Sequence, residues 1–234
     1  MTIAEMHGWF DILQDKYNAP YFTDTEKDEF LNRAQTTFVN EVVYSQMYPT
    51  LQGGERGPQV LSAIESTLSG SEILKPLILE DLSVITVTPN WDLITNDTIN
   101  TAVAAAANSG DEFMHILALE TAGSVFTAGR IVRFVRHNDY LRFKHNIFKK
   151  GTDTNPLWRL VRDGLRVSGT TALTTGESFS LSVIKTPTAV AIAGTDCELP
   201  DFTHDKIIAI ALEFAGIATR DEALALINRG SAGG

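Results

Sequence analysis

The sequence predicts an α+β fold, with N-terminal helices, a central sheet of short, mostly antiparallel strands, and C-terminal helices. Three observations predict it. Apolar residues recur at helical spacing in residues 24–46. Short runs rich in Leu, Ile and Val, separated by Gly, Pro and Asn, follow in the middle of the chain. Helical spacing then returns after residue 203. Helices first, strands next and helices last is an element order typical of α+β proteins.

Two helices are expected at the N-terminal end. The first covers residues 4–16, and Ala19-Pro20 interrupts the pattern behind it. The second covers residues 24–46, and Thr23 and Glu26 are spaced as a capping box at its start. Its apolar stripe consists of Phe30, Leu31, Ala34, Phe38, Val39 and Val42.

Acidic residues crowd the first turns of this second helix, namely Asp24, Glu26, Asp28 and Glu29. Four carboxylates could in principle bind a metal ion. However, the positive end of the helix dipole favours negative charge there. Helix electrostatics therefore explain the group, and we predict no metal site.

The middle of the chain is expected to hold short elements. We expect a helix over residues 58–68, a strand over 73–87 interrupted by Pro76, and a buried strand over 113–119. Residues 98–108 are ambiguous between helix and strand. Residues 129–136 indicate a strand, and Asn138 is a plausible N-cap for a helix that reaches Gly151. Asp163-Gly164 favours a tight hairpin turn between strands 157–161 and 165–167.

The C-terminal part is expected to contain a strand over residues 179–184, a further strand start near Val190, and two helices. Thr203 is the predicted cap of the first helix, and residues 220–227 form the second. A flexible tail follows at 231–234. No repeat or linker divides the chain, so we expect one domain over residues 1–234.

Composition excludes several classes of protein. Of the 234 residues, 44% are hydrophobic and 21% are charged, which is ordinary for a globular protein and argues against disorder. The single cysteine, Cys197, fits folding in a reducing cytoplasm. The first residues lack the basic and apolar parts of a secretory signal, and no apolar stretch is long enough to cross a bilayer. We expect no membrane partner.

The charge is unevenly distributed. Residues 130–166, the basic segment, contain ten Lys or Arg residues against three Asp, a net charge of +7. Because the whole chain carries −10, the remainder carries −17. An acidic body disfavours non-specific binding to nucleic acid by the protein as a whole. The basic segment is therefore the candidate contact surface.

No familiar catalytic motif is present. The sequence has neither a phosphate-binding loop nor a nucleophile elbow. Its histidines (His7, His115, His137, His145 and His204) lack metalloprotease spacing, and His115 is interpreted as a core or interface residue. Cys197 stands between Asp196 and Glu198, which raise a thiol pKa and make it a poor nucleophile. We predict no catalytic, cofactor or metal site and no enzyme activity.

Three interpretations of the basic segment stay open. It could contact an acidic neighbouring subunit, bind nucleic acid, or form a solvated face. Aromatic residues interleave with its cations, as they do in some stacking sites for nucleic acid. In the helical part, however, those aromatics fall on the predicted buried stripe, which favours subunit contact. This stripe consists of Tyr140, Leu141, Phe143, Ile147 and Phe148. The interface candidates are Arg130, Arg133, Arg136, Arg142, Lys144, Lys149 and Lys150.

Three stretches resemble virion structural proteins of podoviruses, of the crAss-like and related Bacteroidota-infecting groups. The first, residues 21–35, is similar to the opening helix of that family. The second runs from Val135 through Phe148 and on to Trp158. The third comprises residues 184–187 followed by 197–200 and 204–211. Together they cover most of the chain, while residues 53–108 are largely unmatched.

The resemblance implies a ring or adaptor protein of the head–tail connector, located in the virion and assembled in the host cytoplasm. It implies a homo-oligomeric ring of about twelve subunits, which would match a portal. Portal, connector and tail proteins would be partners, and DNA would pass through the lumen without sequence recognition. Two alternatives of other classes are a nucleic-acid-binding protein that uses residues 130–166 and a hydrolase or transferase of unfamiliar type.

Overall fold

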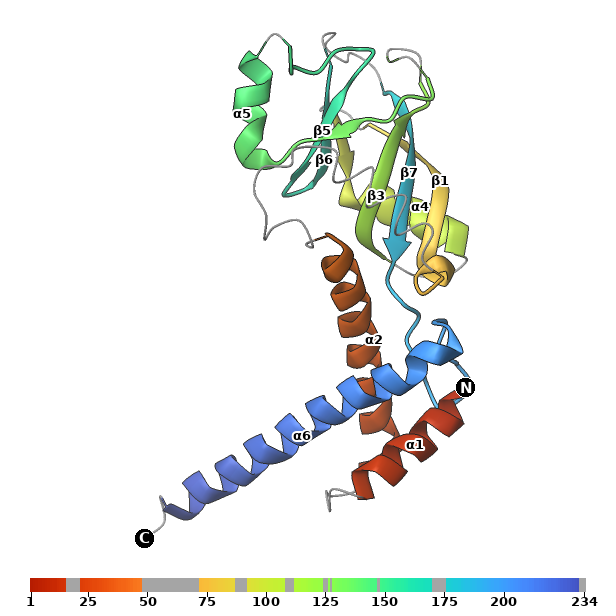
Figure 1. Ribbon diagram of the computed structural model, residues 1–234, viewed down its shortest axis with the longest axis vertical. Helices are drawn as coiled ribbons and strands as arrows, with labels where there is room; N and C mark the ends of the chain where they lie inside the picture. Colours follow the sequence, from red (N-terminus) through yellow and green to blue (C-terminus); the bar gives the residue numbers. More distant parts are fainter. Residues whose placement is uncertain are drawn as a thin grey trace. The chain divides into compact units, whose positions relative to one another are not determined.

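The computed structural model describes residues 1–15, 22–47, 72–86, 92–107, 112–123, 126, 128–146, 148–169 and 176–231. The chain forms two compact units. The helical unit comprises Met1–Ser45, Glu72–Pro76 and Pro187–Gly234, and the sheet unit comprises Gln46–Ser71 and Leu77–Thr186. Figure 1 shows both units, with the helices and most strands labelled. The predicted α+β class is confirmed, since helices begin and end the chain around mostly antiparallel sheets.

The helical unit contains α1 (Ile3–Asp15), α2 (Asp24–Met47) and α6 (Asp201–Ser231). The capping box of α2 is confirmed: the Thr23 amide donates to Glu26 Oε2 at 2.7 Å, and the Glu26 amide donates to Thr23 Oγ1 at 3.4 Å. The Thr23 hydroxyl also donates to Glu26 Oε2 at 2.8 Å, and the bonds from the Thr23 amide and hydroxyl lower the pKa of the Glu26 carboxyl below its ordinary value. The predicted stripe of α2 is buried, apart from Phe30, which is half-buried.

The C-terminal helix differs from the prediction. One continuous helix, α6, replaces the two that were expected. Thr203 is not its cap, because the helix begins at Asp201; the Thr203 hydroxyl donates instead to the carbonyl of Pro200 at 2.7 Å. The strand expected near Val190 is reduced to an isolated bridge between Ala191 and Thr195.

The first sheet of the sheet unit, sheet A, has the antiparallel order β1-β7-β3. It consists of β1 (Ile78–Ile85), β7 (Ser178–Lys185) and β3 (Phe113–Thr121). The predicted strands over 113–119 and 179–184 are therefore confirmed. The strand predicted over 73–87 begins later, because the short 3₁₀ helix η1 (Lys75–Leu77) occupies the residues around Pro76.

The second sheet, sheet B, has the order β2-β6-β5-β4. It consists of β2 (Leu93–Thr95), β6 (Gly164–Ser168), β5 (Leu157–Val161) and β4 (Arg133–Phe134). The strand expected over 129–136 is short because this segment changes partner. Ile131 bridges to Glu120 at the end of β3, and Arg133 then pairs with Leu157 of β5. The two sheets meet at this corner.

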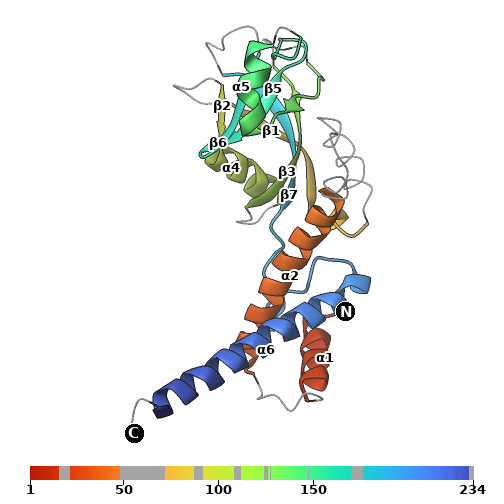
Figure 2. The same ribbon diagram turned by 60° about the vertical axis from the view of Figure 1, so that its left-hand side comes forward.

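The ambiguous segment forms a helix, α4 (Asn96–Ala107), which contacts β1, β2 and β3 (Figure 2). Thr95 caps it, because its hydroxyl oxygen accepts from the Thr98 amide at 3.2 Å. The core of the sheet unit draws on both sheets and α4. It consists of Leu82, Val84, Ile94, Ile99, Val103, Leu119, Phe126, Val132, Trp158, Leu165, Val167, Phe179, Leu181 and Val183.

The predicted hairpin between β5 and β6 is confirmed, but its turn lies one residue earlier. Val161 pairs with Gly164, so Arg162 and Asp163 are the turn residues. Neither has the positive φ of a type I′ turn. Gly164 is required for another reason: its φ is +150°, and a Cβ there would collide with the carbonyl oxygen of Ile94 on β2.

Three expectations lie outside the described residues. These are the helix over 58–68, most of the tail at 231–234, and the connection just before α2 that contains Ala19-Pro20. Ser231 itself is the last residue of α6.

Replacing Phe38 with Ala should lower the stability of the helical unit by about 3–5 kcal/mol, because a large buried ring would leave a cavity. Phe38 is 3% exposed, and the ammonium of Lys206 lies 5.3 Å from its ring centroid. Chemical denaturation followed by helical circular dichroism measures the change. The exposed neighbour Thr37, replaced by Ala, is the control, and a loss below about 1 kcal/mol for Phe38→Ala would contradict the buried stripe.

Candidate interaction surfaces

The basic segment divides into buried and exposed cations. Three arginines lie on one face of sheet B: Arg133 on β4, Arg159 on β5 and Arg166 on β6. Arg159 is directly opposite Arg166, and Arg133 pairs with Leu157, two residues before Arg159. All three are half-buried. Like charges directly opposite each other destabilise a sheet unless other groups compensate them.

Aromatic rings and a carboxylate compensate these charges. The Arg159 guanidinium lies 3.9 Å from the centroid of Tyr140, and that of Arg133 lies 5.3 Å from the centroid of Phe143. Both rings belong to α5 (His137–His145), which packs against β5. Arg166 forms an ion pair with Asp92 at 3.3 Å. Cation–π contacts of this kind contribute about 0.5–2 kcal/mol each, so the arginines hold α5 on sheet B.

Two further contacts fix the turn after α5 and the helix itself. The Arg133 guanidinium donates to the Lys149 carbonyl at 2.9 Å, and the Tyr140 hydroxyl lies 3.3 Å from Ser168 Oγ on β6. In Figure 1, α5 lies on one side of β5 and β6, and sheet A lies on the other. Arg133 was an interface candidate, and the structure gives it partners within its own sheet unit.

The remaining cations of the basic segment are exposed. They are Arg130, Arg136, Arg142, Lys144, Lys149, Lys150 and Arg162. Arg142 approaches Asp139 only at 4.0 Å with its side chain 85% exposed, so that pair contributes little. Six of the seven interface candidates are therefore accessible to a partner.

Two large apolar side chains are exposed among these cations: Leu141 is 64% exposed and Phe148 is 96% exposed. The sequence had placed both on a buried helical stripe, and that expectation is wrong. The helix begins after Arg136, without a cap from Asn138, and ends at His145. Asn146 has an extended backbone, with φ −93° and ψ 117°, so Phe148 leaves the helical pattern. A turn follows, in which the Lys150 amide donates to the Asn146 carbonyl at 2.8 Å.

We call the exposed apolar and cationic Lys or Arg side chains of α5 and this turn the α5 surface. It comprises Leu141, Arg142, Lys144, Phe148, Lys149 and Lys150. Exposed apolar side chains within a charged rim are typical of surfaces that bind another macromolecule.

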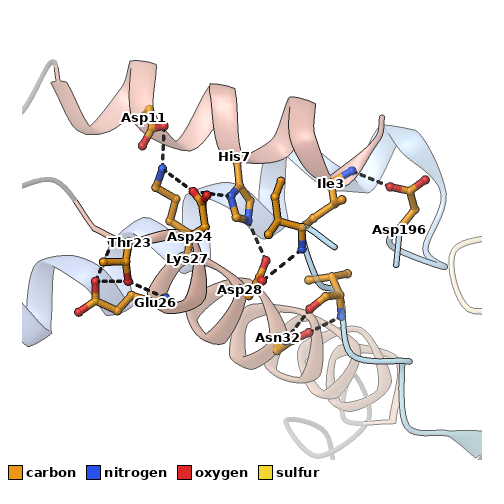
Figure 3. Close-up of polar contacts among 12 residues, drawn as sticks. Ile3, His7, Asp11, Thr23, Asp24, Glu26, Lys27, Asp28, Asn32 and Asp196 are labelled. Carbon is orange, nitrogen blue, oxygen red and sulfur yellow. Dashed lines mark hydrogen bonds and ion pairs between the residues drawn. The ribbon is translucent and has the colours of Figure 1, made fainter. Parts of the chain in front are cut away.

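The helical unit contains a second cluster of charges, between α1 and α2 (Figure 3). His7, whose side chain is 6% exposed, lies 2.8 Å from Asp28 and 3.5 Å from Asp24. The buried Lys27 ammonium lies 2.8 Å from Asp11 and 3.5 Å from Asp24. Two of the four carboxylates attributed to the helix dipole, Asp24 and Asp28, therefore also contact His7 or Lys27. Apart from the i,i+3 pair of Lys27 with Asp24, the contacts join separate helices, so periodicity within either helix could not reveal them.

Residues 187–200 are held against the helices by side-chain hydrogen bonds. The Asn32 amide binds both backbone groups of Val190, donating to its carbonyl at 3.0 Å and accepting from its N–H at 2.7 Å. Asp28 accepts from the Ile192 amide at 3.2 Å. Asp196 accepts from the Ile3 amide at 2.7 Å. The bonds to Val190 and Ile192 satisfy backbone groups that the segment does not pair in a sheet, and Asp196 satisfies an N–H in the first turn of α1.

The residues considered for catalysis do not converge. Within the described part of the chain, no group of three or more His, Cys, Asp or Glu side chains is arranged to hold a metal ion. His115 lies half-buried on β3, where burial lowers its pKa, whereas His145 is exposed on α5. His204 is buried in α6, and its Nε2 lies 2.8 Å from the Leu199 carbonyl. The side chain of His137 lies outside the part of the chain that the structure describes.

Cys197 has a pKa raised to about 11. The sequence predicted the direction from its acidic neighbours; burial is the larger cause, and Glu198 and Asp196 add to it. Its thiol lies 3.2 Å from the side-chain oxygen of Gln35 on α2. A thiol that rarely ionises is a weak nucleophile.

Comparison of the chain with known proteins does not assign it to a family. No model of a known protein family matches the chain, and no curated protein matches it as a relative. Among the described residues, no helix is long and apolar enough to span a membrane. The resemblance to connector proteins therefore stays a prediction.

Replacing Asp28 with Ala should destabilise the helical unit by about 2–3 kcal/mol, because His7 and the Ile192 amide would both lose a charged acceptor. Replacing the exposed neighbour Glu29 with Ala, near the same helix end, should change stability by less than about 0.5 kcal/mol. Urea denaturation of both variants provides the comparison. Equal losses would show that the helix dipole, and not the cluster, accounts for the role of Asp28.

Alkylation of Cys197 by iodoacetamide should be slow in the folded protein. With a pKa of about 11, roughly one thiol in a thousand is ionised at pH 8. The same thiol in urea-unfolded protein should react about a hundredfold faster, because its pKa returns to the ordinary value. Mass spectrometry over time measures both rates. Equal rates in the two states would contradict the raised pKa.

Proposed function

We propose that this chain is a structural subunit of an oligomeric ring in the head–tail connector of a tailed bacteriophage. It would join portal to tail and form part of the DNA channel. The observation that carries the proposal is the α5 surface, where exposed apolar side chains lie among exposed cations on an otherwise acidic protein. A subunit interface would bury Leu141 and Phe148, and the charges would set its register.

The charge distribution also suits a DNA channel. A chain with a net charge of −10 presents mainly negative potential to DNA. Such a lumen would repel the phosphate backbone and let DNA slide during ejection. The three stretches that resemble connector proteins point to the same class, and the second of them contains α5.

One observation favours a second candidate, a nucleic-acid-binding protein. Phe148 is 96% exposed and is followed by Lys149 and Lys150, an arrangement that could stack on a base and contact phosphates. Against it, the rings of Tyr140 and Phe143 are already occupied by Arg159 and Arg133. Of the three aromatic rings on α5 and the following turn, Phe148 is therefore the one left to stack on a base.

Native mass spectrometry and negative-stain images of the purified full chain, from low to high micromolar concentration, test the first proposal. We expect closed rings of about twelve copies that form as concentration rises. A chain that stays monomeric over this range, and binds DNA with an affinity that falls steeply with salt, would instead support the second candidate.

A further inference from the structure

The exposed edge of sheet A has the properties of a partner for the α5 surface. Among the described strands, β1 pairs only with β7, so its other edge has no strand beside it. We call the exposed residues of strand β1 the β1 edge; they are Glu80, Asp81, Ser83 and Ile85. Ile85 is 50% exposed, whereas the alternate residues Leu82 and Val84 are buried in the core.

A β-bulge presents the two acidic residues of this edge. The pairing with β7 shifts register between Leu79 and Leu82, and the intervening Asp81 has a positive φ of 57°. A carboxylate oxygen of Asp81 accepts from the Ser180 hydroxyl at 3.1 Å, which fixes its orientation. Asp is one of the few residues that adopt this backbone conformation readily. The edge therefore presents two exposed carboxylates, Glu80 and Asp81, and the exposed apolar side chain of Ile85; the Asp81 carboxylate is held in one orientation.

We propose that the α5 surface of one copy docks on the β1 edge of a second copy of this chain. This inference rests on the proposed ring and names its interface. The charges are complementary, since four cations face two carboxylates, and each surface contributes exposed apolar side chains: Leu141 and Phe148 on one, Ile85 on the other. Apolar contact would supply affinity, and the charges would select the register.

The placement of the two surfaces favours a ring. Both belong to the sheet unit, and Figure 1 places α5 and β1 at opposite sides of it. One copy cannot bring its own two surfaces together, so each copy would present one to each neighbour. An interface between two different patches is heterologous, and repeating it produces a closed ring when the rotation closes.

Protection of the sheet edge and binding of nucleic acid each account for only half of these observations. Acidic residues and a bulge can protect an edge strand from aggregation, but that role leaves Leu141 and Phe148 uncovered. Binding of nucleic acid would use the cations of the α5 surface, but it gives no role to Glu80, Asp81 and Ile85. A second copy uses both surfaces.

Charge reversal with rescue tests the interface. The variants are R142E/K144E on the α5 surface and E80K/S83K on the β1 edge, each in the full chain; Asp81 is kept, because lysine does not readily adopt its positive φ. Each should raise the concentration at which rings half-form by about tenfold or more, because each places like charges opposite each other across the interface. The quadruple variant should assemble close to wild type. An equimolar mixture of the two double variants should also recover assembly, because alternating copies restore every opposite-charge contact.

Two controls separate the interface from charge and folding effects. E112K/E213K changes net charge at least as much as E80K/S83K, at exposed residues outside both surfaces, and should assemble normally. K150E reverses a cation beyond the end of α5 and leaves in place Lys149, whose ammonium lies 5.6 Å from the Phe143 ring centroid. K150E should therefore weaken assembly without altering the last turn of the helix. Circular dichroism melts identify any double variant that is unfolded.

The outcomes distinguish the inference from the proposed function. If wild type forms rings and neither reversal weakens them, or if rescue fails in folded variants, the interface is wrong while the ring stands. If R142E/K144E loses affinity for DNA but assembles normally, the α5 surface binds nucleic acid and the inference is likewise wrong. If wild type forms no ring at any concentration, both the proposed function and the inference fail.

Discussion

The contact between arginines and aromatic rings beneath α5 determines which charges of the basic segment are available. Arg159 and Arg166 are directly opposite on neighbouring strands, and Arg133 extends the same row. A row of half-buried cations needs compensation, and Tyr140, Phe143 and Asp92 supply it. The stacking orients α5, and that orientation in turn leaves Leu141 and the following basic turn exposed.

Buried charged side chains also need compensation in the helical unit, where aspartates supply it in place of aromatic rings. Lys27 and His7 are almost fully buried between α1 and α2, and three aspartates surround them. Loss of one carboxylate would leave a buried cation with fewer partners, which costs more than the pair itself contributes. Asp28 also binds the Ile192 amide, so the cluster couples the packing of the two helices to the position of the segment before α6.

Local signals in the sequence predicted local structure well. The capping box at Thr23 and Glu26 and the four-residue apolar spacing predicted α2 to within one residue of its end at Met47. Short apolar runs predicted β3 and β7. Each of these signals depends on residues that are neighbours along one element, so tertiary contacts were not needed to interpret them.

The features that escaped prediction depend on contacts between distant segments. Gly164 was assigned to a turn, although its lack of a side chain serves the approach of β2, some seventy residues earlier in the chain. The segment 129–136 changes sheets at Ile131, which no periodicity encodes.

The same dependence on contacts between distant segments explains why the sequence located the basic segment but did not show which of its cations are exposed. Counting charges identified residues 130–166, yet a count treats Arg133 and Arg136 alike. The structure separates them, because a strand residue on the face under α5 is enclosed, whereas the residue just before the helix is exposed. Interleaved aromatics were equally ambiguous: two of them are occupied by arginines, and Phe148 is exposed. A basic segment rich in aromatics therefore contains two groups of residues: those that stabilise the local fold and those that remain exposed to a partner. The sequence does not separate the two groups, because the separation depends on which residues the strands and α5 bring into contact.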